Sequence, residues 1–229
     1  MTKQYEELTV RALYAEPDHS IAYPLLARFT YPWEALGEIS DYIRARGATL
    51  SAEDFDRIGE DVWIAKSATV APTAAIHGPC IICDRAEIRH CAFIRGNVVV
   101  GCGAVVGNST EVKNSILFDE AKAPHFNYVG DSILGYKAHL GAGVITSNVK
   151  LDEKKVAIRN GDVCYPTGRK KVGAMVGDHA EIGCSTVLNP GTVIGRNSNV
   201  YPLTTVRGIV PENCIVKGGY AFEKVETEE

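Results

Sequence analysis

The 229-residue chain, with 45% hydrophobic and 23% charged residues, is long enough to bury a core as one domain or as one domain with a small accessory unit. Its net charge of -4 gives no basic character, and no stretch reaches the roughly 18 apolar residues that span a bilayer, so we expect neither a nucleic-acid nor a membrane partner. The N-terminus lacks a basic segment followed by an apolar run, so we expect a soluble cytoplasmic protein.

Residues 1–57 form the first predicted unit, and their pattern is that of short helices. After Pro32, apolar residues recur every three to four positions up to Gly47, as in an amphipathic helix. Ser51 with Asp54 indicates a second helix start. We find no catalytic motif in this stretch and expect a small helical unit that docks against or caps the rest of the chain.

Residues 58–229 form the second predicted unit, in which apolar residues recur every six positions. An α-helix does not have this period, and a plain alternating strand would not need turn-tolerant residues such as Gly101 and Gly107 so regularly, whereas short strands joined by tight turns fit both features. Three hexads make one triangular coil of about 18 residues, and successive coils stack at the parallel-strand spacing of about 4.8 Å. The period therefore predicts a mainly β protein, a parallel β-helix with a C-terminal cap. Its apolar marks are Ile58, Ile64, Val70, Ile76, Ile82, Ile88, Ile94, Val100, Val106, Val112 and Phe118, then Leu134, Leu140, Val176, Ile182, Leu188, Ile194, Val200 and Val206.

The period is interrupted twice. Phe118 and Leu134 are 16 positions apart rather than 18, so two residues are missing from a stretch that contains His125 and Tyr128. Residues 149–171 leave the pattern altogether and carry seven Lys or Arg residues, which indicates an extruded loop. Such a loop is either merely solvated or reaches a phosphorylated ligand over a neighbouring subunit.

Two cations occupy equivalent places in adjacent coils. Arg95 and Lys113 each follow the apolar mark of their hexad and are 18 residues apart, so they share one outer face. Outward cations at strand spacing repel unless an anion lies between them, which favours a phosphate or carboxylate partner over two solvated side chains. If the missing residues shorten the turns around Val129, Tyr128 lies beside this pair.

The seven cysteines are an odd number in a chain without an evident secretion signal, which favours free thiols over disulfides. Cys80 and Cys83 have CxxC spacing, but no second CxxC completes a four-ligand zinc site. Cys91 follows His90 directly. We expect packing residues at these positions rather than redox centres or metal ligands.

The hexads resemble those of the hexapeptide-repeat acyltransferases, whose β-helix is left-handed. Three strings are more specific: EVKNS at 111–115, HFNYVGD at 125–131 and LGAGVITSN at 140–148. They are similar to the acetyltransferase domain of the bifunctional glucosamine-1-phosphate acetyltransferase and N-acetylglucosamine-1-phosphate uridyltransferase. The resemblance implies a homotrimer with sites between subunits. No GxGTRM-like loop occurs in residues 1–57, so uridyltransferase activity is not expected.

The resemblance also implies roles for individual residues. His125 matches the general base, and a backbone N–H of the turn from Gly141 to Gly143, a region that would also adjoin CoA, would hold the oxyanion. His139 stands where the family has an Asn close to the amino group, which makes it a second catalytic candidate or a mere turn residue. Val149 replaces a Tyr of the family. The implied substrate-binding residues are Arg95, Lys113, Tyr128, Asn148 and Lys154.

From the resemblance we expect an enzyme that moves an acetyl group from acetyl-CoA to an amino or hydroxyl group of a sugar phosphate or nucleotide sugar, without a metal. One alternative is a non-catalytic sugar-nucleotide-binding or assembly protein. Another is a metal hydratase like the γ-carbonic anhydrases, which would need His125, His139 and either His90 or His179 to converge on one metal.

Overall fold

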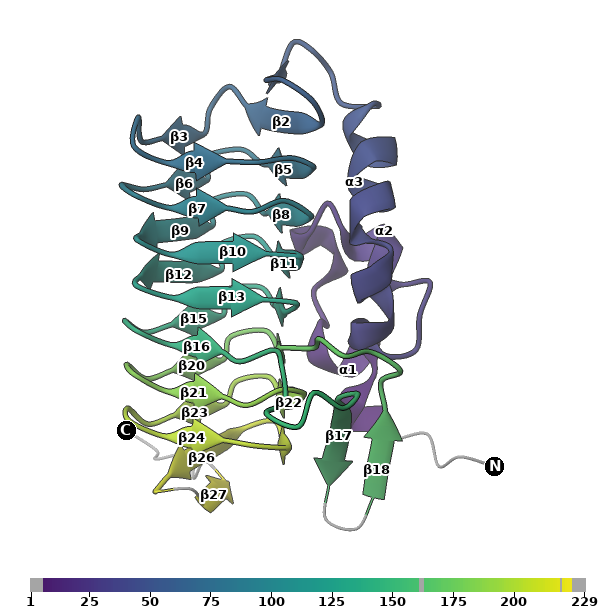
Figure 1. Cartoon of the computed structure of the whole chain (residues 1–229), viewed down its shortest axis with the longest axis vertical. Coiled ribbons are helices and arrows are strands. Elements are labelled where there is room, and N and C mark those ends of the chain that lie inside the picture. The colour runs from purple at the N-terminus through teal and green to yellow at the C-terminus, as the bar shows by residue number, and fades with distance from the viewer. Residues whose placement is uncertain (1–5, 161–162, 219, 224–229) are drawn as a thin grey trace.

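The computed structural model describes residues 6–160, 163–218 and 220–223, and a stack of triangular coils dominates it (Figure 1). In the described residues, three sheets of nine, seven and nine strands form the sides of the coils, and all pairs are parallel except β1–β2 and β26–β27 at the two ends. The predicted fold class, a mainly β, left-handed parallel β-helix with a small helical unit, is confirmed.

The three sheets are named here A, B and C. Sheet A contains β1 (Phe55–Arg57), β2 (Val62–Ala65), β5 (Cys80–Ile82), β8 (Val98–Val100), β11 (Ser115–Leu117), β14 (Ile133–Leu134), β19 (Ala174–Val176), β22 (Thr192–Ile194) and β25 (Ile209–Val210). Sheet B contains β3 (Thr69–Val70), β6 (Glu87–Ile88), β9 (Val105–Asn108), β12 (Lys122–His125), β15 (His139–Leu140), β20 (Glu181–Ile182), β23 (Asn199–Val200), β26 (Cys214–Lys217) and β27 (Tyr220–Glu223). Sheet C contains β4 (Ala75–Ile76), β7 (Phe93–Ile94), β10 (Glu111–Lys113), β13 (Tyr128–Gly130), β16 (Ile145–Thr146), β21 (Val187–Leu188) and β24 (Thr205–Val206).

The hexad marks from Ile64 to Val112 line the inside of the coils, where they form one apolar column. Ile58, the first expected mark, is instead 56% exposed. The reason is that the chain before β2 runs antiparallel along the first coil as β1. The division into units at residues 57 and 58 stays a prediction.

The two missing residues are dropped at successive corners between sheets C and A. Val112 pairs with Ile94 at a spacing of 18, whereas Ile116 pairs with Val99 at 17, so one residue is lost at Asn114. The pairing of β11 with β14 shows a second loss at Asp131. The expected count of two is therefore right. The expected place around Val129 holds for the loss at Asp131 and is wrong for the loss at Asn114.

The first of these losses changes which residue faces inward. Leu117, not the expected Phe118, joins the column inside the coil. Phe118 points outward from sheet A and stacks on Tyr14 with ring centroids 5.0 Å apart. Its burial therefore belongs to a second core, between the coil and the helical unit.

The helical unit covers the outer face of sheet A (Figure 1). Apolar residues of the helices pack there against outward residues of the sheet, such as Ile81, Val99 and Met175. No helix in the described part of the chain is long and apolar enough to cross a membrane. The helices are η1 (Glu6–Leu8), α1 (Val10–Leu13), η2 (Pro17–His19), α2 (Tyr23–Leu26), η3 (Pro32–Gly37) and α3 (Ile39–Gly47).

Residues 149–171 leave the coil as expected, but they fold back on the same second core. They form a hairpin of β17 (Ala157–Asn160) and β18 (Val163–Pro166), which lies on the same side of the coil as the helices (Figure 1). Val156, Ile158 and Tyr165 are buried in that core. Of the described charged residues, Lys154, Lys155, Arg159 and their exposed neighbours face solvent, whereas Arg169 is partly buried, so only part of the segment is a solvated loop.

Candidate functional site

His125 lies at a corner of the coil, where β12 of sheet B ends and the chain turns into sheet C. Phe126 makes the turn with a φ of 52°, and the buried Asn127 holds it. The Asn127 Oδ1 accepts a hydrogen bond from the His125 backbone N–H at 3.1 Å, and its Nδ2 donates to the Gly141 carbonyl at 2.8 Å. Asn127 therefore ties two coils together and presents the exposed His125 ring at the corner.

Tyr128 begins β13 and lies on the outer face of sheet C, next to Glu111 in the coil above. Its hydroxyl accepts a hydrogen bond from Asn148 Nδ2 at 3.2 Å. The same Nδ2 donates to Asp131 Oδ2 at 2.6 Å, and Lys113 Nζ lies 3.3 Å from that oxygen. The predicted residues Lys113, Tyr128 and Asn148 are thus brought together around Asp131.

Both predicted cations have carboxylate partners within the chain. Arg95 Nη1 lies 2.6 Å from Glu111 Oε1, and Lys113 pairs with Asp131. The hydrogen bond that Arg95 donates to Glu111 raises the pKa of the guanidinium, and the negative charge of Glu111 raises it further. The two cations thus have carboxylate partners, one of the two kinds of anion expected from the sequence, and the chain itself supplies them. Repulsion between the cations is therefore no argument for a bound phosphate. The sequence contained a signal for the Glu111 partner. Side chains alternate between the two faces of a strand, so Glu111 and Lys113 of β10 point to the same side.

The Tyr128 hydroxyl has a perturbed titration. Burial raises its pKa most, and the negative charges of Glu111 and Asp131 raise it further, against the hydrogen bond from Asn148. The phenol is therefore protonated at neutral pH. Because its oxygen already accepts from Asn148, its proton is available to a ligand.

His139 lies apart from this cluster, in β15 of sheet B. The pairing of Lys122 with His139 makes Ala142 the residue below His125, so His139 is three residues, or about 10 Å, from the corner. Its Nδ1 lies 2.7 Å from Glu181 Oε2 in the next coil. The structure gives His139 a carboxylate partner that the sequence analysis missed.

The turn from Gly141 to Gly143 directly follows His125 along the stack. The Gly143 N–H donates to the His125 carbonyl at 3.0 Å, and the Gly141 N–H donates to Ile182 at 2.7 Å. Both expected oxyanion donors are therefore already used to join the coils. Between them, the N–H of Ala142 has no acceptor among the described residues.

Lys154 is exposed in the segment that leaves the coil, and its side chain makes no contact with the cluster in the described part of this chain. Val149 forms an isolated bridge with Lys171 at the base of that segment. The structure therefore does not bring Lys154 to the other predicted residues within one chain.

The histidines considered as metal ligands point to different partners. His90 contacts Thr73 and Cys91, and His179 contacts Glu16. In the residues that the structure covers, no three His, Cys, Asp or Glu side chains are grouped so that they could hold a metal ion.

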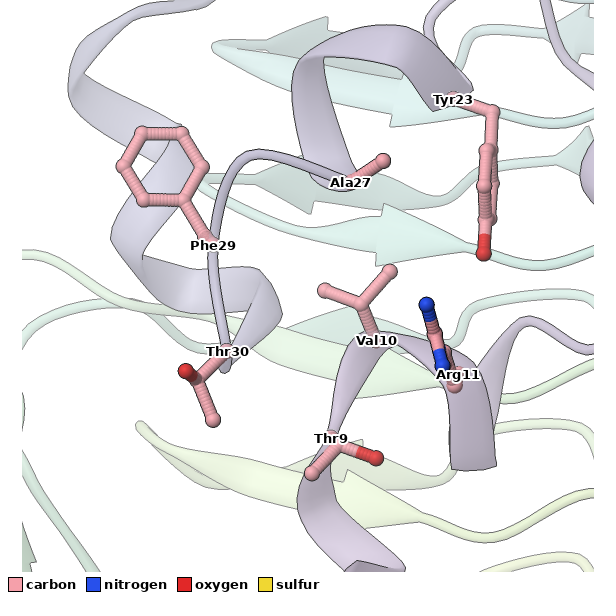
Figure 2. A pocket seen from close by; sticks show the side chains of 7 residues that line it. All are labelled: Thr9, Val10, Arg11, Tyr23, Ala27, Phe29 and Thr30. Atoms are coloured by element: carbon pink, nitrogen blue, oxygen red, sulfur yellow. The ribbon is translucent and has the colours of Figure 1, made fainter.

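A cavity of about 390 Å³ lies within the helical unit and away from His125 (Figure 2). It is lined by Thr9, Val10, Arg11, Tyr23, Ala27, Phe29 and Thr30. A second cavity, of about 440 Å³, lies between that unit and the lower coils and includes Val193 and Pro211. Neither cavity contains a predicted site residue. The candidate site residues lie instead on the outer side of sheets B and C, where His125 and Arg95 are exposed.

Comparison with known proteins agrees with this architecture. The family model described as the GMPPB C-terminal domain matches residues 76–165. YaiX of Escherichia coli K12, named as an acetyltransferase, is 31% identical over 156 residues, which are 68% of this chain and 68% of YaiX. The chain belongs to the hexapeptide-repeat acyltransferases. The predicted family is thereby confirmed.

Other hexapeptide-repeat acyltransferases match over different shares of their length. The bifunctional protein GlmU of Methanococcus maripaludis is 32% identical over 188 residues, which are 81% of this chain and 43% of that protein. The chain thus spans less than half the length of the first curated relatives it matches. Among solved structures, the polySia-specific acetyltransferase NeuO aligns with a TM-score of 0.44 at 11% identity, covering 71% of this chain and 85% of NeuO.

Proposed function

We propose that the protein transfers an acetyl group from acetyl-CoA to an amino or hydroxyl group of a sugar phosphate or nucleotide sugar. The observation that carries the proposal is the order of groups along one turn: the exposed His125 ring is three residues before Tyr128, whose hydroxyl belongs to the polar cluster around Asp131. The names of relatives support it: the bifunctional sugar-1-phosphate nucleotidylyltransferase/acetyltransferase of Sulfurisphaera tokodaii is 37% identical over 97 residues, which are 42% of this chain and 24% of that protein.

His125 is the proposed general base. Its exposed ring has no side-chain partner in the described residues, so it can take the proton of the acceptor as that group attacks the thioester carbonyl carbon. The C–S bond of the thioester then breaks, and the CoA thiolate takes the proton from His125. No covalent enzyme intermediate is needed. The Ala142 N–H, one coil below, is the proposed donor to the tetrahedral oxyanion.

The outer face of sheet C is the proposed acceptor site. Tyr128 would donate its proton to a sugar oxygen, and Asn148 would position the ring through the bonds it makes to Tyr128 and Asp131. Arg95 is the proposed phosphate anchor, because its ion pair with Glu111 is exposed and therefore weak. Lys113 would stay bound to the buried Asp131.

We also propose that a second copy of the chain completes the site, in a homotrimer. The exposure of His125 and Arg95 within one chain supports this, since water exclusion strengthens electrostatic catalysis. Lys154 would then reach the acceptor of a neighbouring subunit, and His139 with Glu181 would line the same interface. Residues 1–57 would dock along sheet A and leave sheets B and C for assembly.

Release of CoA thiol tests the proposal, with acetyl-CoA and a panel of amino-sugar phosphates and nucleotide sugars. His125→Ala should lower turnover by about 10²- to 10⁴-fold, because it removes the general base. Its thermal unfolding should match that of the wild type, since the side chain makes no described contact. Wild-type turnover in this variant would remove His125 from the mechanism. Acceptor binding without thiol release in the wild type would favour a sugar-nucleotide-binding protein instead.

A further inference from the structure

A second group of reactive side chains lies outside the proposed site, at the corner between β6 and β7. His90 Nε2 lies 3.2 Å from Cys91 Sγ, and His90 Nδ1 lies 2.8 Å from Thr73 Oγ1. Thr73 Oγ1 also accepts a hydrogen bond from the Cys91 backbone N–H at 3.2 Å. All three residues are exposed in the single chain.

These contacts have the order of an activated nucleophile: a thiol, a base within hydrogen-bond distance, and a third group that orients the base. Thr73 Oγ1 has lone pairs for both the Cys91 N–H and a proton on His90 Nδ1. With that proton on Nδ1, the lone pair of Nε2 faces the Cys91 sulfur. Thr73 is thus a positioning residue for both the base and the thiol.

We propose that Cys91 is a thiol-exchange site that reacts with disulfides of low-molecular-weight thiols. His90 takes the Sγ proton as the sulfur attacks one sulfur of the disulfide. A new S–S bond forms to Cys91, the S–S bond of the reagent breaks, and the departing thiolate takes the proton from His90. Cys91 is oxidised to a mixed disulfide, and half of the reagent is reduced to a thiol.

The chain contains a matched control. Cys184 is also exposed and occupies the equivalent corner between sheets B and C in a lower coil. Among the described residues, no histidine nitrogen lies within hydrogen-bond distance of its sulfur. Cys184 lies one position earlier in its turn than Cys91, at the place that His90 occupies in the upper coil. The two thiols therefore share an exposed corner of the coil but differ in the presence of a histidine partner and by one position in the turn.

The proposal does not depend on acetyl transfer, so its readout is the mass of each cysteine peptide. The full chain is incubated at pH 7 with oxidised glutathione, and adducts are followed over time by mass spectrometry. We expect Cys91 to react at least about tenfold faster than Cys184, a modest part of what a positioned general base supplies. The disulfide of CoA is used in parallel. Equal Cys91 rates with the two disulfides indicate general thiol exchange, and a faster rate with the CoA disulfide indicates selection of CoA.

Variants test the role of each partner. His90→Gln should slow the reaction of Cys91 about tenfold or more and leave that of Cys184 unchanged, which also reports an intact fold. Thr73→Val should slow Cys91, and Thr73→Ser should restore it because the hydroxyl returns. Equal rates at Cys91 and Cys184, or an unchanged Cys91 rate in His90→Gln, would overturn the proposal.

Discussion

Lys113 and Asp131 should be energetically coupled, because their ion pair is largely withdrawn from solvent. The Nζ and Oδ2 atoms are 3.3 Å apart, and the side chains are 25% and 4% exposed. At an effective dielectric constant of about 20, this separation corresponds to an attraction of about 5 kcal/mol, and most of it is offset by desolvation. A coupling energy of about 1–2 kcal/mol is therefore expected, above the range of about 0–1 kcal/mol for exposed pairs.

A double-mutant cycle of Lys113→Met and Asp131→Asn measures this coupling through urea unfolding at pH 7. Asp131→Asn alone should cost about 2–3 kcal/mol, because Asn114 and Asn148 lose their charged acceptor as well. The cycle of Arg196 and Glu212 is a matched control, since that pair is 2.7 Å apart but 32% and 52% exposed. A Lys113–Asp131 coupling no larger than that of the control would refute the reasoning.

Three further predictions concern the site and the two cores. Glu111→Gln should lower KM for a phosphorylated acceptor about two- to fivefold in the thiol-release assay, because it frees Arg95, and should leave KM for the unphosphorylated analogue unchanged. Phe118→Ala should lower the free energy of unfolding by about 3–5 kcal/mol, and Phe118→Leu by less. The hydrogen bond from His179 holds the pKa of Glu16 below its ordinary value of 4.5, so its stabilisation is present at neutral pH and lost as pH falls through the folded-state pKa. The Tm of the wild type should therefore drop more steeply in acid than that of Glu16→Gln.

The fold could be predicted from the sequence as far as the six-residue period held. From Ile64 to Val112 the period identifies the inward residues, because every coil places equivalent positions in one column. Just after Asn114 it fails at Phe118, since a residue dropped at a corner moves the frame by one position and leaves no local signal. The predicted marks from Leu134 to Val206 lie inside the coils again. Phe118 was assigned to the wrong core for that reason.

The sequence predicted that the basic and hydrogen-bonding side chains of the candidate site lie together, but it did not predict the acidic side chains beside them. Spacing brings Lys113 and Tyr128 to one face, whereas the place of Asp131 depends on the corner at which a residue is lost. The basic charge of residues 149–171 likewise hid the apolar residues Val156 and Ile158, whose burial turns the segment back toward the helices.

The shortened corners at Asn114 and Asp131 have a consequence for how such coils acquire new specificity. In an ordinary sheet, loss of one residue sends every following side chain to the opposite face. Here the bend absorbs the loss, and the inward column continues with Leu117. The side chains at the two shortened bends, Asn114 and Asp131, are buried and hydrogen-bonded to each other. The second shortened corner thus carries Asp131, which lies against Lys113 of the neighbouring coil. Building a similar polar cluster into a plain β-helix requires both shortened corners and the amide and acid side chains at them.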